Sequence, residues 1–423
     1  MRIRLDGGLV RPAFEQAIRD TVARQPMLRA LIRPRGWRSH QWEFENVPEP
    51  TIDWIDQTPT DDYPETTFLD PRKEPGLRVT VITDGKRTHV ALLVHHCSVD
   101  GLSTMALITE VLINYTNLIA PNGEQIPLPV IDISRLPQRN AFGLTWWKIL
   151  KMLPVQLLGL RRVQKFFTNR VIPLTPHEPL ADDDPLPPGY PKVICRALDA
   201  KQTKRFIAAT KHRGVTVNDT VMWGLFTGAR DWQEKYATKR EKGHLRMVVP
   251  INLRGPNDGD LPATNVASIV FIDHKRSSGY TPEKALSKIH REMSLIKQFQ
   301  HGLTFLQALW VVRFTPGGIR KGARDRRKVS MIFSNLGRVL TRTPFETDED
   351  GQIRVGDAVI THVDFMPPLR PFLCASLGLV WYANRLHFTL HYDPRVMSPD
   401  QSEDLMTTLF DRLHSFTDEQ TVV

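Results

Sequence analysis

The sequence predicts an α/β protein made of two similar halves joined by a proline-rich linker. Patterns typical of strands and helices alternate up to about residue 119, and they alternate again from about residue 201 onward. Between them, residues 172–191 hold seven prolines and a run of three aspartates, a composition that excludes a helix or a central strand. We therefore expect layered α/β halves at 1–171 and 193–423, with a linker at 172–192.

In the first half, two neighbouring segments, 77–82 and 90–94, alternate apolar with polar residues. Asp84 and Gly85 between them favour a tight turn, so the two segments are predicted to form a β-hairpin. After the hairpin, apolar residues at helical spacing predict a helix over 102–115. The elements expected before it are a strand at 3–5, a helix from Pro12, and strands at 28–32 and 42–44.

The second half repeats this mixture of elements. The elements expected first are helices at 201–212 and around Val221, strands at 245–249 and 266–273, and a helix at 282–298. Towards the end, segments 377–382 and 386–392 predict a second hairpin around Ala383 and Asn384. A capping box that starts at Ser398 then predicts the last helix.

The composition is that of a globular protein, with 41% hydrophobic and 24% charged residues among 423. We find no apolar run of the roughly 18–20 residues that a membrane span needs, and no signal-peptide core at the amino terminus. The three cysteines, Cys97, Cys195 and Cys374, are too scattered for a disulfide framework or a zinc knuckle. We expect a reduced, cytoplasmic chain.

The net charge of +10 favours anionic partners, such as a phosphate-bearing co-substrate, an acidic carrier protein or an anionic membrane surface. No nucleic-acid-binding motif is present, so nucleic acid is not an expected partner. Two basic stretches, 141–167 with Trp146 and Trp147 and a tract at 320–328, fit the inner membrane surface. For the first stretch an amphipathic core helix fits slightly better, and a tract like the second is usually a solvated loop.

The segment at 90–94 ends in two histidines, His95 and His96, and Asp100 and Gly101 follow closely. Because successive side chains of a strand point to opposite faces, the two imidazoles are expected to point opposite ways. One ring can then enter a cavity and act as a general base while the other packs into the scaffold. The alternative is a pair of buried structural histidines.

The heptad His95-His96-Cys97-Ser98-Val99-Asp100-Gly101 fits the H-H-x-x-x-D-G pattern of the coenzyme A-dependent acyltransferase superfamily. That group includes chloramphenicol acetyltransferase, condensation domains of nonribosomal peptide synthetases, wax ester synthase/diacylglycerol acyltransferases and alcohol acetyltransferases. Weaker similarities follow in the family's order at 25–29, 74–77, 217–219, 249–254 and 333–337. The plant relatives' Asp-Phe-Gly-Trp-Gly is absent, and the wax ester synthases' Pro-Gly-Pro is replaced after Gly337, which leaves the subfamily open.

The resemblance implies two chloramphenicol acetyltransferase-like α/β sandwich subdomains with an active-site channel at their interface. It makes His96 the general base, which takes the proton of an acceptor that attacks a thioester carbonyl, and His95 a scaffold residue. Asp100 is expected to shape the loop through an arginine, and Arg254 and Arg29 both qualify. Gly101 is expected to permit a tight turn into the helix.

Other polar residues have two readings each. Ser334 or Asn335 fits an oxyanion donor or channel residue, and equally a turn that caps a strand. Asn218 and Asp219 resemble a family motif that supports the site, but they fit helix caps better than catalytic groups. For Cys97, a role as nucleophile fits the pattern less well than an incidental position. For His391-Tyr392-Asp393, a second site fits it less well than a structural role.

The resemblance implies an acyltransferase with acyl-CoA or a phosphopantetheine thioester as co-substrate, no permanently bound cofactor and no metal. The basic stretches favour a lipid-like hydroxyl acceptor. The alternatives are an amide-forming condensation enzyme that uses carrier proteins, and a non-catalytic binding module of the same fold. His95 and Asp100 also fit the H-x-x-x-x-D motif of glycerol-phosphate acyltransferases, but the phosphate-binding partner motif of those enzymes is missing.

Overall fold

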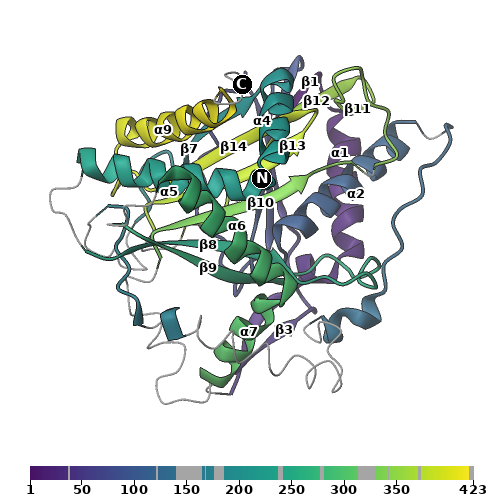
Figure 1. Cartoon of the computed structure of the whole chain (residues 1–423). Helices are drawn as coiled ribbons and strands as arrows, with labels where there is room; N and C mark the ends of the chain where they lie inside the picture. The colour runs from purple at the N-terminus through teal and green to yellow at the C-terminus, as the bar shows by residue number, and fades with distance from the viewer. Residues whose placement is uncertain are drawn as a thin grey trace.

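The computed structural model describes residues 1–36, 39–120, 122–139, 164–166, 168–175, 185–236, 242–276, 281–312, 329–341, 343–369 and 373–418. Within these ranges it holds two six-stranded mixed sheets and a small two-stranded one. Helices α1 and α2 lie together beside the first sheet, and α4, α5, α6 and α9 lie with the second (Figure 1). The predicted fold class, two α/β halves, is confirmed.

The first sheet has the order β11-β12-β1-β6-β5-β4. Its strands are β1 (Arg2–Asp6), β4 (Thr51–Asp56), β5 (Leu77–Thr83), β6 (Arg87–Val94), β11 (Arg354–Val355) and β12 (Ala358–Asp364). Neighbours are antiparallel except β4 and β5, which run parallel. The predicted hairpin is β5–β6, and Gly85 at its turn has a φ of 80°, a conformation that glycine adopts without strain.

The core of the first half lies between this sheet and two helices, α1 (Arg11–Arg24) and α2 (Gly101–Ile119). Alternate strand residues such as Val79, Val81 and Val90 are at most 1% exposed and pack in one cluster with Phe14 and Leu112. Burial of each such side chain contributes about 1.5–3 kcal/mol. This packing anchors the strand that leads into the two histidines.

The second sheet has the order β7-β14-β13-β10-β8-β9. Its strands are β7 (Lys192–Leu198), β8 (His244–Asn252), β9 (Ala267–Lys275), β10 (Met331–Arg338), β13 (Ala375–Tyr382) and β14 (Arg385–Tyr392). The accompanying helices are α4 (Ala200–His212), α5 (Val217–Tyr236), α6 (Pro282–Gln298), α7 (His301–Val312) and α9 (Pro399–Asp418). The predicted capping box of α9 is present, because Gln401 N donates to Ser398 Oγ and Ser398 N donates to Gln401 Oε1.

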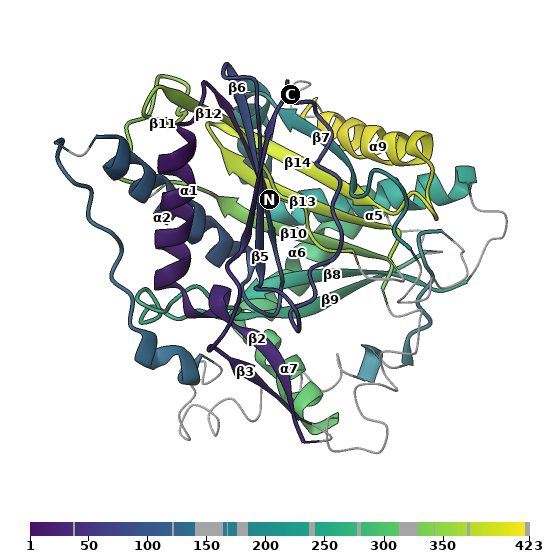
Figure 2. The same ribbon diagram turned by 180° about the vertical axis from the view of Figure 1, so that it is seen from behind.

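Two strands from the second half of the chain belong to the first sheet. β12 pairs antiparallel with β1, with Arg2 opposite Asp364, and β11 extends the same edge. Figure 2 shows β11 and β12 beside α1, away from β8 and β9. The segment expected as the second half, 193–423, therefore contributes strands to both sheets. Its strands β11 and β12 join the two halves.

Several local expectations were wrong or incomplete. The strand expected at 28–32 is a short 3-10 helix, η1 (Pro26–Arg29), followed by β2 (Leu31–Arg35), which pairs with β3 (Ser39–Glu43). Proline at the first position of η1 favours the helical turn there. Strands β4, β7, β10, β11 and β12 were not predicted.

By length and composition α2 is long and apolar enough to cross a membrane, which no segment was expected to be. About 61% of its most apolar window is buried inside the fold. Among the described residues, α2 is the one helix that meets this length and hydropathy criterion, and it is buried as the core helix of a globular fold is.

Candidate active site

The histidine pair lies in a turn between β6 and α2. His95 N donates to the carbonyl of Gly76 at 2.9 Å, and Ser98 N donates to the carbonyl of His95 at 2.9 Å. This turn leaves His96 exposed, while Ser98 and Asp100 are buried behind it. The two histidines thus differ in exposure, and His96 is the one that a substrate can reach.

His95 is half-buried, and its contacts are local. Its Nδ1 lies 2.7 Å from Cys97 Sγ and 3.2 Å from Cys97 N. Burial lowers the pKa of His95, and the neighbouring His96 lowers it further. Burial also raises the pKa of the Cys97 thiol, which disfavours the thiolate that a cysteine nucleophile needs.

The exposed ring of His96 is held by Asn265, a residue of the other half that the sequence analysis missed. Asn265 Nδ2 lies 2.9 Å from His96 Nδ1 and donates to the His96 carbonyl at 2.7 Å. Asn265 stands just before β9 and 169 positions from His96. An asparagine before an apolar strand suggests only a turn, so no local signal in the sequence marked it.

Asp100 shapes the loop and starts α2. Its Oδ1 accepts from Ser103 N at 2.9 Å, which makes it the N-cap of the helix. Its Oδ2 accepts from Arg254 Nη1 at 2.7 Å and from Val266 N at 2.9 Å. Of the two candidate arginines, Arg254 is therefore the partner, whereas Arg29 donates to the carbonyl of Ala23.

Arg254 also ties the second half to α2. Its Nη2 donates to Ser103 Oγ at 2.8 Å and to the Thr264 carbonyl at 2.7 Å. Ser103 Oγ in turn donates to the same carbonyl at 2.8 Å. The segment from Arg254 to Val266, which belongs to the second half, is thus hydrogen-bonded to the start of α2. Asn265 in the same segment contacts His96.

Two glycines at the site lie close to neighbouring side chains. A Cβ on Gly76 would collide with Ser98 Oγ. A Cβ on Gly101 would lie 2.7 Å from Leu336 Cδ2. Gly101 is not among the residues with positive φ, so no left-handed conformation requires glycine there, contrary to the expected tight turn.

Ser334 and Asn335 lie in β10, whose end reaches the motif through Leu336. Ser334 is buried, and Asn335 Oδ1 accepts from Gly337 N at 2.7 Å, which is the turn role weighed for it. Within the part of the chain that the structure describes, neither side chain is hydrogen-bonded to His96. β10 is thus adjacent to the site, and an oxyanion role for either residue stays a prediction.

Asn218 and Asp219 lie at the start of α5, away from the contacts around His96 and Asp100. Asp219 Oδ2 accepts from Thr216 N at 3.0 Å, and Asp219 N donates to Thr216 Oγ1 at 3.2 Å. The same carboxylate lies 2.8 Å from His290 Nδ1. Thr216 is therefore the N-cap of α5, and Asp219 is the N3 partner in its capping box, which is a structural role.

Other expected features are structural or lie elsewhere. His391 is buried, and its Nδ1 donates to the Pro367 carbonyl at 2.9 Å. The tract at 320–328 and most of 141–167 lie outside the described residues. At the end of the latter, Phe166 packs on Phe271 with ring centres 4.5 Å apart, and Arg246 lies over its ring.

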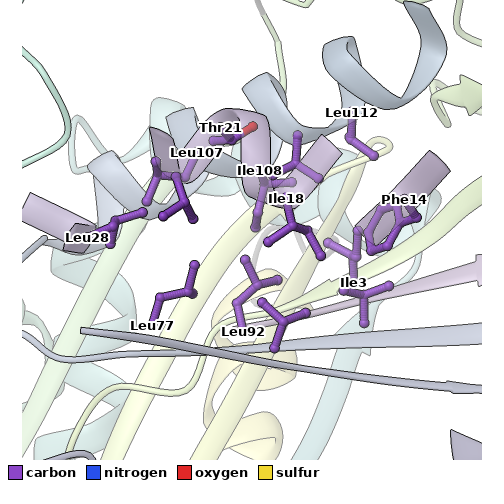
Figure 3. A pocket seen from close by; sticks show the side chains of 14 residues that line it. Ile3, Phe14, Ile18, Thr21, Leu28, Leu77, Leu92, Leu107, Ile108 and Leu112 are labelled. Carbon is purple, nitrogen blue, oxygen red and sulfur yellow. The ribbon is translucent and has the colours of Figure 1, made fainter. Parts of the chain in front are cut away.

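Two cavities of the described chain lie away from His96. One, of about 20 Å³, is an apolar void between α1, α2 and the first sheet, with Phe14, Ile18 and Leu77 in its walls (Figure 3). The other, of about 310 Å³, is polar and is lined by Arg4 and His89 among others. No group of three His, Cys, Asp or Glu residues within the described ranges is arranged to hold a metal ion.

No family model and no curated protein sequence matches the chain. Solved structures do match it over nearly its whole length. The first condensation domain of the calcium-dependent antibiotic synthetase superposes with a TM-score of 0.68 at 15% identity, covering 98% of this chain and 90% of that one. The chain has the condensation-domain fold.

Further structures share this fold. The epimerization domain from the third module of tyrocidine synthetase B gives a TM-score of 0.64 at 13% identity, covering 99% of this chain and 92% of that one. Polyketide synthase associated protein 5 from Mycobacterium tuberculosis gives 0.58 at 16%, covering 99% and 94%. These likenesses confirm the fold of paired α/β subdomains that the resemblance implies.

Proposed function

We propose that this protein is a condensation-type acyltransferase, which moves an acyl group from a carrier-bound thioester to an amine or hydroxyl acceptor. The observation that carries the proposal is the exposed His96, held at the junction of the two halves by Asn265 from the second half. A reacting group must be reachable by substrate and held by rigid elements, and His96 meets both conditions.

The solved structures favour a carrier protein over free acyl-CoA as the donor. The similar proteins include parts of an antibiotic synthetase and of tyrocidine synthetase B. Another matching structure concerns condensation domain-mediated chain release from the enacyloxin polyketide synthase. These relations support the alternative given by the sequence, an amide-forming condensation enzyme that uses carrier proteins, over a lipid O-acyltransferase that uses acyl-CoA.

In the proposed reaction the acceptor nitrogen or oxygen bonds to the thioester carbonyl carbon, and the carbon–sulfur bond breaks. The proton of the acceptor ends on the leaving sulfur, so a free thiol appears for each acyl group transferred. In this proposal His96 is the side chain next to the reacting atoms. The role of general base that the sequence predicts for it stays a prediction.

The test measures thiol release from a panel of donors, namely acyl-CoA and acyl-phosphopantetheine on a carrier protein, each with amine, alcohol and lipid acceptors. We expect turnover with the carrier-bound donor and a loss of about 10²–10⁴-fold in His96→Ala, the usual effect of removing a group that takes part in proton transfer. The matched control is His212→Ala, because His212 is an exposed histidine at the end of α4.

Each other outcome would count against a stated part of the proposal. Equal thiol release by the wild type and His96→Ala would show that His96 is not the reacting histidine. Turnover with acyl-CoA and a lipid alcohol alone would restore the main reading of the sequence analysis. A folded protein that turns over no pair would favour a non-catalytic binding module.

A further inference from the structure

The Asn265 side chain contacts both the backbone and the ring of His96. Its Nδ2 donates to the His96 carbonyl at 2.7 Å and lies 2.9 Å from His96 Nδ1. An amide NH₂ group has two hydrogens, so one nitrogen can donate to both atoms. The contact therefore holds the ring by one nitrogen and leaves Nε2 for a substrate.

The orientation of the Asn265 amide follows from its other partner. Asn265 Oδ1 accepts from Ala267 N at 3.0 Å, and a backbone N–H can only donate. The His96 carbonyl can only accept, so it requires the NH₂ end of the amide. A flipped amide would lose both bonds, and the orientation is thus assigned from the network.

A hydrogen-bond donor next to Nδ1 determines where the neutral ring carries its proton. Nδ1 must present a lone pair to Asn265 Nδ2, so the single ring proton lies on Nε2. We infer that Asn265 is a positioning residue that holds His96 in the Nε2–H tautomer. The tautomer is a property of the free protein and does not depend on the proposed function. Only its role in catalysis rests on the proposed function.

This arrangement differs from the one in which a carboxylate accepts from Nδ1–H and so stabilises a charged imidazolium. Asn265 offers no acceptor to Nδ1. The exposed Nε2–H then donates a hydrogen bond, and its target in the proposed reaction is the thioester oxygen, where negative charge develops. To act as a base through Nε2, the ring would first have to break its contact with Asn265.

The test is nuclear magnetic resonance of the protein with ¹⁵N-labelled histidine rings, in which His96→Gln identifies the His96 signals. Above the pH at which the ring loses its charge, we expect the His96 signals of the wild type to show a proton on Nε2 and an unprotonated Nδ1. Asn265→Asp places a hydrogen-bond acceptor at Nδ1, so we expect the proton to move to Nδ1. Asn265→Ala removes the donor, and we expect the Nδ1 signal to shift away from its wild-type position.

Asn117→Ala is the matched control. Asn117 also bonds two backbone groups, because its Nδ2 donates to the Ile126 carbonyl at 2.9 Å and its Oδ1 accepts from Ile126 N at 2.8 Å. Asn117 lies near the carboxyl end of α2, about four helical turns from the motif, so its loss removes the same kind of contact away from His96 and should leave the His96 signals unchanged. A merely structural asparagine would behave like this control.

A wild-type proton on Nδ1, or His96 signals that Asn265→Ala leaves unchanged, would overturn the inference. Failure of the proposed function is a separate result, because the ring signals need no substrate. If the tautomer is as inferred while no thiol is released, Asn265 positions the ring and the function is wrong. If thiol is released and the proton lies on Nδ1, the function stands and the inference falls.

Discussion

Asp100 follows His96 by four residues in the sequence, close enough to look like its partner in a catalytic triad. In the structure both of its oxygens already have partners: Ser103 N on Oδ1, and Arg254 with Val266 N on Oδ2. A carboxylate engaged in this way has no free oxygen directed at the ring of His96. Its contribution to the site is the shape of the loop that presents the histidine.

Breaking this ion pair should cost stability. Asp100 and Arg254 have side chains only 5% and 17% exposed, so Arg254→Met leaves a buried carboxylate without its counter-charge. We expect the free energy of unfolding to fall by about 3–5 kcal/mol, as for other buried pairs that lose one partner. Urea unfolding followed by circular dichroism measures this change.

The control for this prediction is Arg33→Met. Arg33 pairs with Glu43 at 2.6 Å, but both side chains are about 40% exposed, so water screens the pair. The expected loss there is at most about 1 kcal/mol. If the two variants lose the same stability, Asp100 does not depend on Arg254 for its charge balance.

At the scale of elements, the segment after β12 joins the two sheets. It lies directly on β13, where a Cβ on Gly378 would collide with the Phe365 carbonyl and lie 2.9 Å from Pro367 Cδ. Only glycine lets the two backbones approach this closely. The glycine thus permits a crossing between a strand of the first sheet and a strand of the second.

Gly378→Ala should therefore loosen this crossing. We expect a loss of about 1–3 kcal/mol in the free energy of unfolding, the usual cost of overpacking, and faster hydrogen exchange of the β12 amides. Gly259→Ala is the control, because a Cβ at Gly259 meets nothing within 4 Å and should change stability by less than about 0.5 kcal/mol. Unchanged exchange in β12 of the Gly378 variant would contradict the assigned contact.

At the scale of the whole molecule, neutral histidines lie where the two sheets meet. His387 in β14 packs against His362 in β12, with ring centres 5.3 Å apart. Burial lowers the pKa of His387 to about 4, and the nearby His362 adds to this effect. Burial likewise lowers the pKa of His391, on the same strand, to about 4.

These lowered pKa values predict a loss of stability in acid. An unfolded histidine titrates near pH 6.5, so between about pH 6.5 and 4 the unfolded chain binds more protons than the folded protein. The stability from neutral burial is complete above pH 6.5 and is lost as the pH falls towards 4. Between pH 7 and pH 5 we expect each of the two rings to remove about 2 kcal/mol.

Urea unfolding at pH 7 and pH 5 measures this loss, and His387→Gln separates its sources. Glutamine does not titrate, so the difference between the two pH values should shrink by about 2 kcal/mol in that variant. His212→Gln, at an exposed site, should leave the difference unchanged. A His387→Gln variant with the full wild-type dependence would show that His387 titrates normally in the folded protein.

Features that depend on neighbours along the chain were predictable. The hairpins β5–β6 and β13–β14 follow from alternation around a short turn, and α9 follows from a cap beside apolar residues at helical spacing. His96 and Asp100 stand out because the motif is local. In each case the groups that interact are within a few residues of one another, so their pattern is visible in the sequence.

What depended on distant segments could be found only in the tertiary structure. β12 was missed because its partner is β1, more than 350 positions away, and Arg254 was chosen over Arg29 only once the second half met α2. Asn265 had no signal, since its bond to His96 spans 169 positions. The sequence by itself determined the two α/β halves and singled out the histidine that we propose reacts. The folded chain decided which groups hold that histidine, because hydrogen bonds act over about 3 Å in space whatever the separation along the chain.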